Sequence, residues 1–430
     1  MILQNKYNTM IKWAALQPLT GGMYIGAKNA IGDDAQFIIS YPGTNDITKD
    51  KEGNIKLAGN EYNLLEWMKK NGCMVPYWHF SHQMFEDVDI NEIKIQQLNG
   101  ECVYDMPCDL DLVVAVPVCS GLSMLSSGNA DIKRCRNNNM LFLAKYALNI
   151  IKPKIYVFEN APTLMSVRGD EIRTKLEDIA YSAGYSVLYY KTDTYLHHNC
   201  QRRPRTFVIF QKWSGNNPEK PVPFGYEDAQ FNIEEYLKLI PENASQKYMF
   251  DMSPINKCIL EFTKHKFGAT WRNDSDKYLM NNVEKDWQGF IDFVNSTDIV
   301  TDAQKTKIIA FVNHARFKHE QGLNYWANTL IMQKEKTNAV QVRSMQCMIH
   351  PTEDRLFNIR ENLHLMGMPH DFELHGDIAS NHMKIGQNVP VKTAEWIVKE
   401  CLRVLPLLNE SREKSNNVSY IDNVKQKIVY

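Results

Sequence analysis

The chain has 430 residues, of which 44% are apolar and 23% charged, and its formal net charge is −1. This length suits one large domain with a smaller one, or two to three ordinary domains. Because the net charge is close to zero, the chain as a whole does not attract nucleic acid or a membrane surface electrostatically. A nucleic-acid site must therefore be a local basic patch. The sequence contains no run of about 18 apolar residues, which is the length that a membrane-spanning helix needs, so we expect no membrane partner.

The nine cysteines are odd in number and widely scattered, which argues against a disulfide framework. They form no CxxC pair, so we expect no structural zinc site and no other bound metal. Residues 1–13 lack the layout of a signal peptide. We therefore expect a cytoplasmic monomer with free thiols.

The first half of the chain alternates strand-like and helix-like stretches. In chain order, the sequence predicts a strand at Lys12–Leu16, a turn at Thr20–Gly22, a strand at Gln36–Ser40, a helix at Asn60–Asn71, a strand at Leu112–Val116, a helix at Asn138–Ile151, a strand at Lys154–Glu159, a helix at Glu171–Ala183, and strands at Ser186–Tyr190 and Thr206–Phe210. Strands alternating with helices indicate βαβ units. We expect an α/β fold with a doubly wound, mostly parallel, Rossmann-like sheet.

The alternation of strand-like and helix-like stretches ends after the first domain, which we assign to residues 1–212. Residues 213–345 are irregular and rich in Asn, Lys and aromatic side chains, which indicates an inserted second domain. Residues 346–412 return to the first domain and include an amphipathic helix at Lys392–Leu405. Residues 413–430 are polar, and we expect a frayed tail.

Four short stretches carry side chains suited to chemistry. They are Pro117–Ser123 (PVCSGLS), Glu159–Pro162 (ENAP), Gln201–Arg205 (QRRPR) and Gly386–Pro390 (GQNVP). The first three border predicted strands, and the ends of neighbouring parallel strands gather along one edge of a sheet. We therefore expect a thiol, a carboxyl group and arginines to converge on one pocket.

Such a pocket suits a pyrimidine ring. A cysteine thiolate adds to electron-poor carbon, here C6 of cytosine. A buried carboxyl group keeps its proton near neutral pH and engages N3 and the exocyclic amine. An arginine holds O2 with fixed geometry. Addition at C6 turns C5 into an enamine carbon that attacks a one-carbon donor.

The order and spacing of the four stretches resemble the DNA cytosine-5 methyltransferases. That family has a Pro-Cys loop, a Glu-Asn-Val tripeptide, a Gln-x-Arg-x-Arg segment and a late Gly-Asn-x-Val-Pro motif. Arg355–Glu361, followed by MGMPHDF, is similar to the family's Arg-Glu segment and its ending. The resemblance covers most of residues 10–212 and 350–405. It implies a methyltransferase fold with a target-recognition domain at 213–345.

The resemblance also implies a role for each matched residue. Cys119 would be the nucleophile, Glu159 would contact N3 of the base, and Asn160 would brace the loop. Arg203 and Arg205 fall on the family's two arginines, which touch the base and order the catalytic loop. The residues after Cys119 would close on double-stranded DNA, from which the cytosine is flipped out.

The resemblance further implies S-adenosyl-L-methionine as cofactor, bound near Gly21, Gly22, Asp89 and Asn388. The family's Phe-x-Gly-x-Gly loop falls on residues 17–21, where the Phe and the first Gly are missing. The family's second strand ends in an acidic residue that binds the ribose hydroxyls. Here QFIIS runs into YPGTN, and the nearest acid is shifted by several residues.

The catalytic loop departs from the family too, since Val118, Ser120 and Leu122 replace Pro, Gln and Phe. These departures leave two alternatives: an enzyme with another one-carbon donor, such as a folate or a modified adenosylmethionine, and a relative that only binds DNA. A Cys-His hydrolase is a further, formal alternative, because His197 and His198 precede the arginine segment. No motif for its oxyanion site supports it.

Basic and aromatic residues mix at three places in the insert: Lys264–Lys266, Trp271–Arg272 and Arg316–His319. Such mixtures fit phosphate contact and base stacking, and they equally fit ordinary exposed helices. The recognised DNA sequence does not follow from them. The family resemblance implies a bacterial or phage DNA-modification role.

Overall fold

The computed structural model describes residues 10–40, 47–49, 55–57, 60–81, 89–98, 100–117, 122, 139–213, 232–323, 330–333, 337–340, 347–408 and 418–422. The chain divides into two compact units. The first is drawn from 1–229, 366–375 and 387–430, and the second from 230–365 and 376–386. The second unit thus takes in most of the expected insert, together with residues 346–365 and 376–386, which the sequence analysis assigned to the first domain. Cys119 lies outside the described residues.

A ten-stranded sheet organises the first unit, in the order β16-β10-β12-β9-β8-β1-β2-β5-β6-β7. Its strands are β1 (Trp13–Leu16), β2 (Ile38–Ser40), β5 (Tyr77–Phe80), β6 (Ile95–Gln97), β7 (Cys102–Val103), β8 (Leu112–Ala115), β9 (Ile155–Asn160), β10 (Tyr185–Asp193), β12 (Pro204–Lys212) and β16 (Val418–Asp422). The five central strands, from β9 to β5, are parallel. β12 runs antiparallel between β9 and β10. The expected α/β sheet with a parallel core is confirmed.

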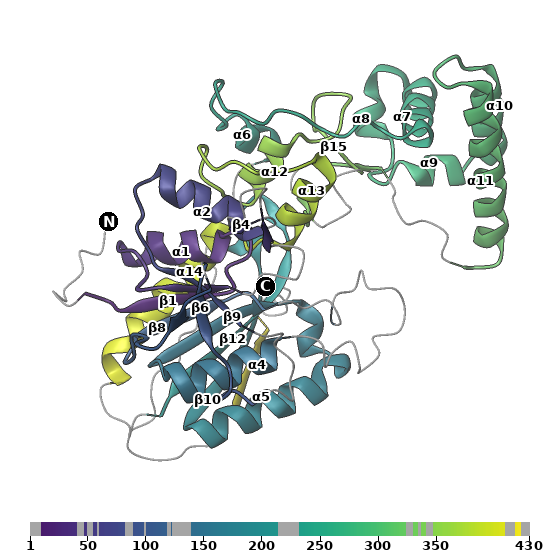
Figure 1. The fold of residues 1–430 in the computed structure, drawn as a ribbon. Helices are drawn as coiled ribbons and strands as arrows, with labels where there is room; N and C mark the ends of the chain where they lie inside the picture. Colours follow the sequence, from purple (N-terminus) through teal and green to yellow (C-terminus); the bar gives the residue numbers. More distant parts are fainter. Residues whose placement is uncertain are drawn as a thin grey trace. The chain divides into compact units, whose positions relative to one another are not determined.

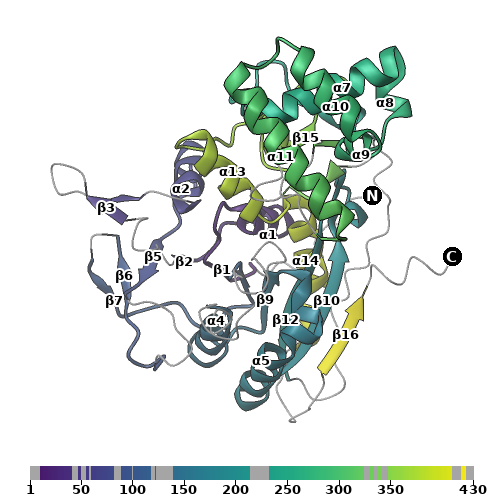
Figure 2. The same cartoon turned by 90° about the vertical axis from the view of Figure 1, so that its right-hand side faces the viewer.

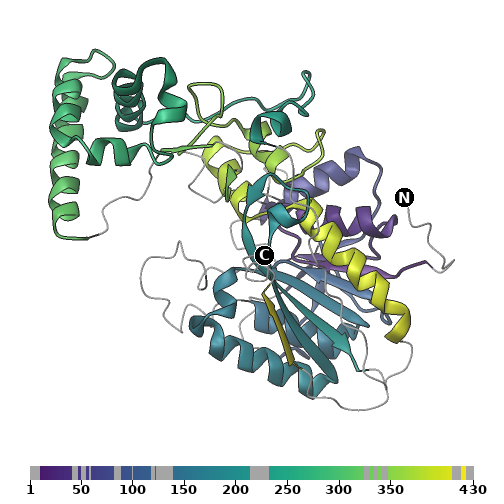
Figure 3. The ribbon, with the colours of Figure 1, turned by 180° about the vertical axis from the view of Figure 1, so that it is seen from behind.

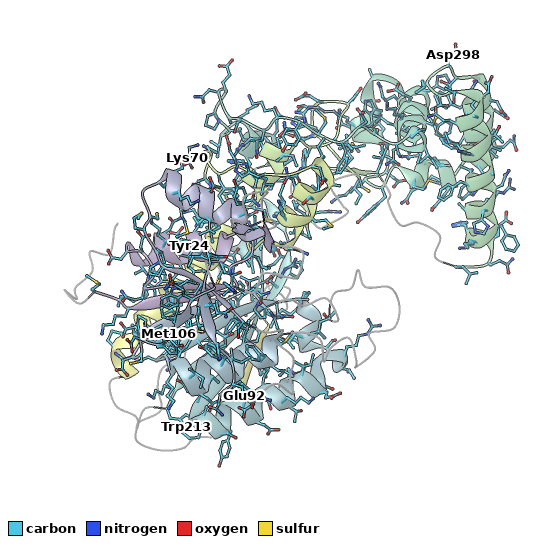
Figure 4. All side chains as sticks on the ribbon, viewed as in Figure 1. Tyr24, Lys70, Glu92, Met106, Trp213 and Asp298 are labelled. Atoms are coloured by element: carbon cyan, nitrogen blue, oxygen red, sulfur yellow. The ribbon has the colours of Figure 1, made fainter. Side chains whose placement is uncertain are left out.

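Helices cover both faces of this sheet (Figures 1 and 3). Its helices are α1 (Gly22–Ile31), α2 (Asn60–Lys70), α4 (Met140–Tyr146), which continues into a π-helical turn (Ala147–Ile151), α5 (Asp170–Ala183) and α14 (Val391–Val404). Trp13 of β1 packs on Tyr24 of α1, labelled in Figure 4, with ring centroids 5.3 Å apart. The alternate residues Ala14 and Leu16 join the core of α4 and α5. The sheet is therefore doubly wound.

The ends of α5 follow from its sequence. Asp170 and Glu171 occupy the first turn, where the helix dipole favours negative charge. Ile172, Leu176 and Ala180 recur every four residues and form the buried stripe. Gly184 ends the helix with a left-handed backbone that glycine adopts at little cost.

The second unit is mainly helical, which corrects the irregular pattern expected for it. Its elements are α6 (Ile233–Leu237), α7 (Pro254–Phe267), α8 (Trp271–Asp274), α9 (Met280–Glu284), α10 (Trp287–Ser296), α11 (Asp302–Glu320), α12 (Ile359–Leu365), α13 (Ile378–Gln387), and the short strands β13 (Ile331–Met332), β14 (Thr337–Asn338) and β15 (Met348–Ile349). Phe262, Phe290 and Val312 lie in its core. The signals at the helix starts are local: Ser253 caps α7 before Pro254, and Thr301 caps α11 in a capping box.

The structure also differs from expectation at the end of the chain. The tail expected to fray contains β16, which pairs in parallel with β10 at the edge of the sheet (Figure 2). Its sequence, Val-Ser-Tyr-Ile-Asp, contains three residues that favour strands, a signal that polar neighbours obscured. The remaining short elements are the antiparallel pair β3 (Ile47–Lys49) and β4 (Ile55–Leu57), and β11 (Gln201–Arg202). Among the described residues, no helix combines the length and apolar character needed to cross a membrane.

Helices α1 and α14 approach closely at Gly26. A Cβ atom on Gly26 would lie 2.5 Å from Cβ of Ala394 and 2.6 Å from the backbone oxygen of Val391. Both positions belong to the start of α14, so neither helix can yield without shifting backbone. The glycine is therefore required by packing rather than by backbone conformation.

We predict that Gly26→Ala destabilises the protein by about 1–3 kcal/mol in urea unfolding, because overpacking outweighs the roughly 1 kcal/mol gain in helix propensity. Asn29→Ala, on the exposed side of the same helix, is the matched control and should be neutral or slightly stabilising. Equal stabilisation by both substitutions would contradict the close approach.

Candidate active site

The ends of the central strands meet at one edge of the sheet, as the sequence analysis expected. Leu16 of β1 pairs with Ala115 of β8, and Ala115 pairs with Phe158 of β9. Asn160, the last residue of β9, pairs with Thr206 of β12. The ENAP and QRRPR segments therefore lie side by side, next to the strand whose continuation leads towards Cys119. The position of the thiol itself lies outside the described residues.

Glu159 and Arg205 form a nearly buried ion pair at this edge. Nε of Arg205 lies 2.7 Å from Oε1 of Glu159, and the two side chains are 17% and 7% exposed. Apart from Arg205, Oε1 has no partner among the described residues, so it keeps capacity to bond another group. The pair joins two of the predicted site residues directly.

The protonation of Glu159 is set by opposing effects. Burial raises the pKa of this carboxyl group, and the charges of Arg205 and Arg203 act against that rise. Burial is the larger effect, so the group holds its proton to higher pH than an exposed glutamate does. This is the property expected of a carboxyl group that donates a hydrogen bond to a ring nitrogen.

Arg203 is 1% exposed and is held from both sides. Its Nη2 donates to the backbone oxygen of Asn388 at 2.9 Å, and its backbone N–H donates to Oδ1 of Asp193 at 2.8 Å. Asp193, which the sequence analysis missed, is itself buried, and burial raises its pKa. Its position at the end of β10, ten residues before Arg203, was the available signal.

Asn160 and Leu122 also make contacts here. Asn160 is fully buried, and its Oδ1 accepts from the backbone N–H of Ala161 at 2.9 Å. The hydroxyl of Thr163 donates to the backbone oxygen of Leu122, which is 2% exposed. Leu122, at the place of the family's Phe, thus packs into the core beside the ENAP segment.

The loop between β1 and α1 has an unusual backbone. Gln17, Leu19 and Gly21 have φ angles of 46°, 51° and 106°, all left-handed. Leu19 stands where the Phe-x-Gly-x-Gly pattern has its first glycine, so the conformation of a glycine loop is kept although the glycine is not. A left-handed non-glycine residue costs about 1–2 kcal/mol, and such strain concentrates at ligand sites.

Asn388 braces this loop. Its Oδ1 accepts from the backbone N–H of Gly22 at 2.9 Å, and its Nδ2 lies 3.0 Å from Sδ of Met368. A Cβ on Gly22 would lie 1.9 Å from the backbone oxygen of Val389, so this glycine lets the GQNVP turn approach. Both ends of the Asn388 amide are therefore engaged within the chain.

Asp89 lies apart from these contacts. It is exposed, and its Oδ1 accepts from both the backbone and the side-chain nitrogen of Asn91 at 2.9 Å. It precedes Glu92, labelled in Figure 4, in the segment that leads into β6. No described contact joins it to Gly21, Gly22 or Asn388.

The two histidines of the hydrolase alternative are both engaged. His197 is fully buried, with Nε2 2.7 Å from the hydroxyl of Thr192, and burial lowers its pKa to about 3. His198 stacks on Trp396 with ring centroids 5.9 Å apart. A histidine this buried is a poor proton acceptor at neutral pH, which disfavours His197 as a general base.

Two of the basic residues that fitted either phosphate contact or ordinary exposed helices bind other residues of the second unit. Arg272 stacks over Trp271 at 4.3 Å and binds Asp354 at 2.7 Å. Lys264 reaches the same Asp354 at 2.8 Å. Phe317 on α11, in contrast, is 59% exposed.

Comparison with known proteins bears on this arrangement. The sequence model described as C-5 cytosine-specific DNA methylase matches residues 66–403, most of the chain. The chain belongs to this family. Membership confirms the resemblance stated from the motifs and makes the protein a relative of transferases.

Curated relatives of the family are distant. "DNA (cytosine-5)-methyltransferase 3" of Arabidopsis thaliana is 20% identical over 346 residues, covering 72% of this chain and 24% of that protein. A putative type II methyltransferase of Methanocaldococcus jannaschii is 25% identical, covering 58% and 61%. A type II methyltransferase of a Psychrobacter species is 23% identical, covering 82% and 76%. The chain therefore spans less than two thirds of the first two relatives.

A solved structure, described as a putative DNA modification methyltransferase encoded within a prophage of E. coli, is also similar. It is 18% identical, covers 92% of this chain and 99% of its own, and has a TM-score of 0.48.

We predict a pH-dependent stability difference between the ligand-free protein and Glu159→Gln. Because the folded-state pKa is raised, the folded state binds the proton more tightly than the unfolded state. The contribution of Glu159 is fully present below its unfolded pKa of about 4.3, and is lost as the pH rises from there. The wild type should lose stability relative to the variant at up to about 1.4 kcal/mol per pH unit in urea unfolding. A constant difference between pH 4 and pH 8 would contradict the raised pKa.

We predict that Asn388→Ala costs about 1–3 kcal/mol in unfolding free energy, because the buried N–H of Gly22 loses its acceptor. Asn388→Asp keeps an oxygen at that place and puts negative charge at the N-terminus of α1, so it should lose less. If Asn388→Ala leaves stability unchanged and weakens only donor binding, Asn388 is a cofactor contact and not a brace.

Proposed function

We propose that the chain is a DNA cytosine-5 methyltransferase that acts on a cytosine flipped out of double-stranded DNA through a covalent Cys119–C6 adduct. The observation that carries this proposal is Glu159: a nearly buried carboxyl group with a raised pKa, paired with Arg205, on the strand next to the one that leads to Cys119. Family membership supports the reaction class.

The residues would share the chemistry as follows. The Cys119 thiolate forms a bond to C6, and the C5–C6 electron pair moves towards C5. Protonated Glu159 donates a hydrogen bond to N3 and stabilises the charge that develops on the ring. After C5 gains the methyl group, loss of the C5 proton restores the double bond and releases the thiolate. The base for this proton has no candidate among the described residues.

Arg203 and Arg205 would differ in their roles. Arg205 is partly exposed and contacts Glu159, so it can hold both the carboxyl group and the base. Arg203 is bound to the backbone of Asn388 and would act as a positioning residue that links the catalytic edge to the loop before α1.

The strand order reverses between β1 and β8. The base would bind on the β8 and β9 side of this point, and the donor would bind on the other side, at the carboxyl ends of β1 and β2. S-adenosyl-L-methionine supplies an electrophilic methyl group when bound. The left-handed loop at residues 17–21 and the N-terminus of α1 would hold it, with Gly21 and Gly22 shaping the turn and Asp89 as a further candidate contact. The loop keeps a glycine-like conformation, which favours this donor over a folate.

We predict that cells expressing the protein contain 5-methyldeoxycytidine in their DNA and that cells expressing Cys119→Ser do not, by mass spectrometry of nucleosides. Glu159→Gln should lower product formation by about 10²–10⁴-fold, because the ring loses its proton donor. DNA containing 5-fluorocytosine should trap a covalent complex with the wild type, which Cys119→Ser cannot form.

The same measurements separate the alternatives. A different cytosine adduct that depends on Cys119 would keep the site and replace the donor. DNA binding without adduct or modified base, unchanged in Cys119→Ser, would overturn the enzyme proposal in favour of a DNA-binding relative. Trp13→Phe, in the core at the amino end of β1 and thus away from the carboxyl ends of the strands, controls for loss of folding.

A further inference from the structure

Two buried polar side chains lie next to each other at the donor side of the sheet. Ser40 ends β2, and His79 lies on β5 as its partner in the parallel register. Paired residues of neighbouring strands point to the same face, so both side chains project to the face that α1 covers. Ser40 is 1% exposed and His79 is 8% exposed.

Each of these side chains has a polar atom left over. Within the part of the chain that the structure describes, Oγ of Ser40 and Nδ1 of His79 have no hydrogen-bond partner. A side-chain hydrogen bond with Gln96 of β6 engages His79 elsewhere. Roughly 90% of buried polar groups in native structures are satisfied. Two neighbouring unsatisfied atoms at the edge where the donor is proposed to bind can therefore accept a bonding partner from outside the chain.

Their position indicates which part of a ligand they meet. In doubly wound sheets, a nucleotide binds at the carboxyl ends of the strands beside the switch point, with its ribose at the residue that ends the second strand, about 20 residues after the glycine turn. Ser40 ends the second strand and follows the Gly21 turn at about this interval. The neighbouring His79 adds a second nitrogen at the same level of the sheet.

The chemistry of the pair fits a neutral diol. Burial lowers the pKa of His79, so its ring is neutral at pH 7 and carries one donor and one acceptor. A serine hydroxyl both donates and accepts. Two vicinal hydroxyl groups can bond to such a pair without any carboxylate.

We propose that Ser40 and His79 bind the ribose hydroxyls of a nucleoside donor, in the role that an acidic residue at the end of the second strand fills elsewhere in the family. This inference rests on the proposed function for the nucleoside nature of the donor. It assigns a neutral ribose contact to a chain whose second strand ends without an acid.

The test is calorimetric titration of the full chain with S-adenosylhomocysteine, for the wild type, Ser40→Ala and His79→Phe. Each substitution should raise Kd about three- to tenfold, the loss of roughly one hydrogen bond. The analogue whose ribose lacks both hydroxyl groups should bind the wild type and Ser40→Ala with nearly the same reduced affinity, because the contact is then already lost.

Thermal unfolding without ligand gives a second, independent readout. Ser40→Ala removes an unsatisfied buried hydroxyl, so its Tm should stay equal to or rise above that of the wild type. Tyr156→Phe is the matched control: its hydroxyl is also buried without a partner, in the core on the α4 and α5 side of the sheet. It should raise Tm in the same way and leave Kd unchanged.

The outcomes distinguish the two proposals. No binding of S-adenosylhomocysteine to the wild type overturns the nucleoside donor of the proposed function, and the ribose contact with it. Binding to the wild type with an unchanged Kd in Ser40→Ala and His79→Phe overturns the ribose contact alone. A lower ligand-free Tm in Ser40→Ala would show that its hydroxyl serves the fold, which also overturns it.

Discussion

The contact on which the first unit depends is the one that Asn388 makes with the start of α1. Oδ1 of Asn388 accepts from Gly22 across 366 residues of sequence, and its backbone oxygen accepts from Arg203 across 185. One buried residue thus fixes the start of α1, the arginine segment and the start of α14 to each other. Because Gly22 has no side chain, the GQNVP turn can come close enough to make this contact.

The side chains at the carboxyl ends of the strands differ in charge between the two sides of this sheet edge. On the β8 and β9 side, burial raises the pKa of the Glu159 carboxyl group, although the charges of Arg205 and Arg203 oppose this rise. On the β1 and β2 side, no acid is present among the described residues at the strand ends, and polar neutral side chains take its place. Among the described residues, the buried ion pair at this edge therefore lies on the β8 and β9 side.

Sequence reasoning went furthest where the pattern was local. Strands β1, β2, β8, β9, β10 and β12 and helices α5 and α14 follow from apolar periodicity, and the parallel core follows from their alternation. The short strands β5, β6 and β7 were not predicted. The pairing of Glu159 with Arg205 was anticipated only as convergence on one edge, because a register is set by partners that the sequence does not name. Ser40 and His79 were missed because each is a single polar residue in an apolar stretch, and Asp193 because it lies among other polar residues. Their significance comes from burial, which spacing does not reveal.

The discontinuous make-up of the first unit has a consequence for its synthesis. Asn388 emerges from the ribosome 366 residues after Gly22, which at about 5–20 residues per second takes roughly 20–70 s. During that time α1 lacks the helix that packs on it at Gly26, and its apolar surface is open to other partners. The second unit, drawn mostly from one continuous stretch, can form its own core before then. The start of α1 thus gains the contact that fixes it only after the residues of the second unit have been synthesised.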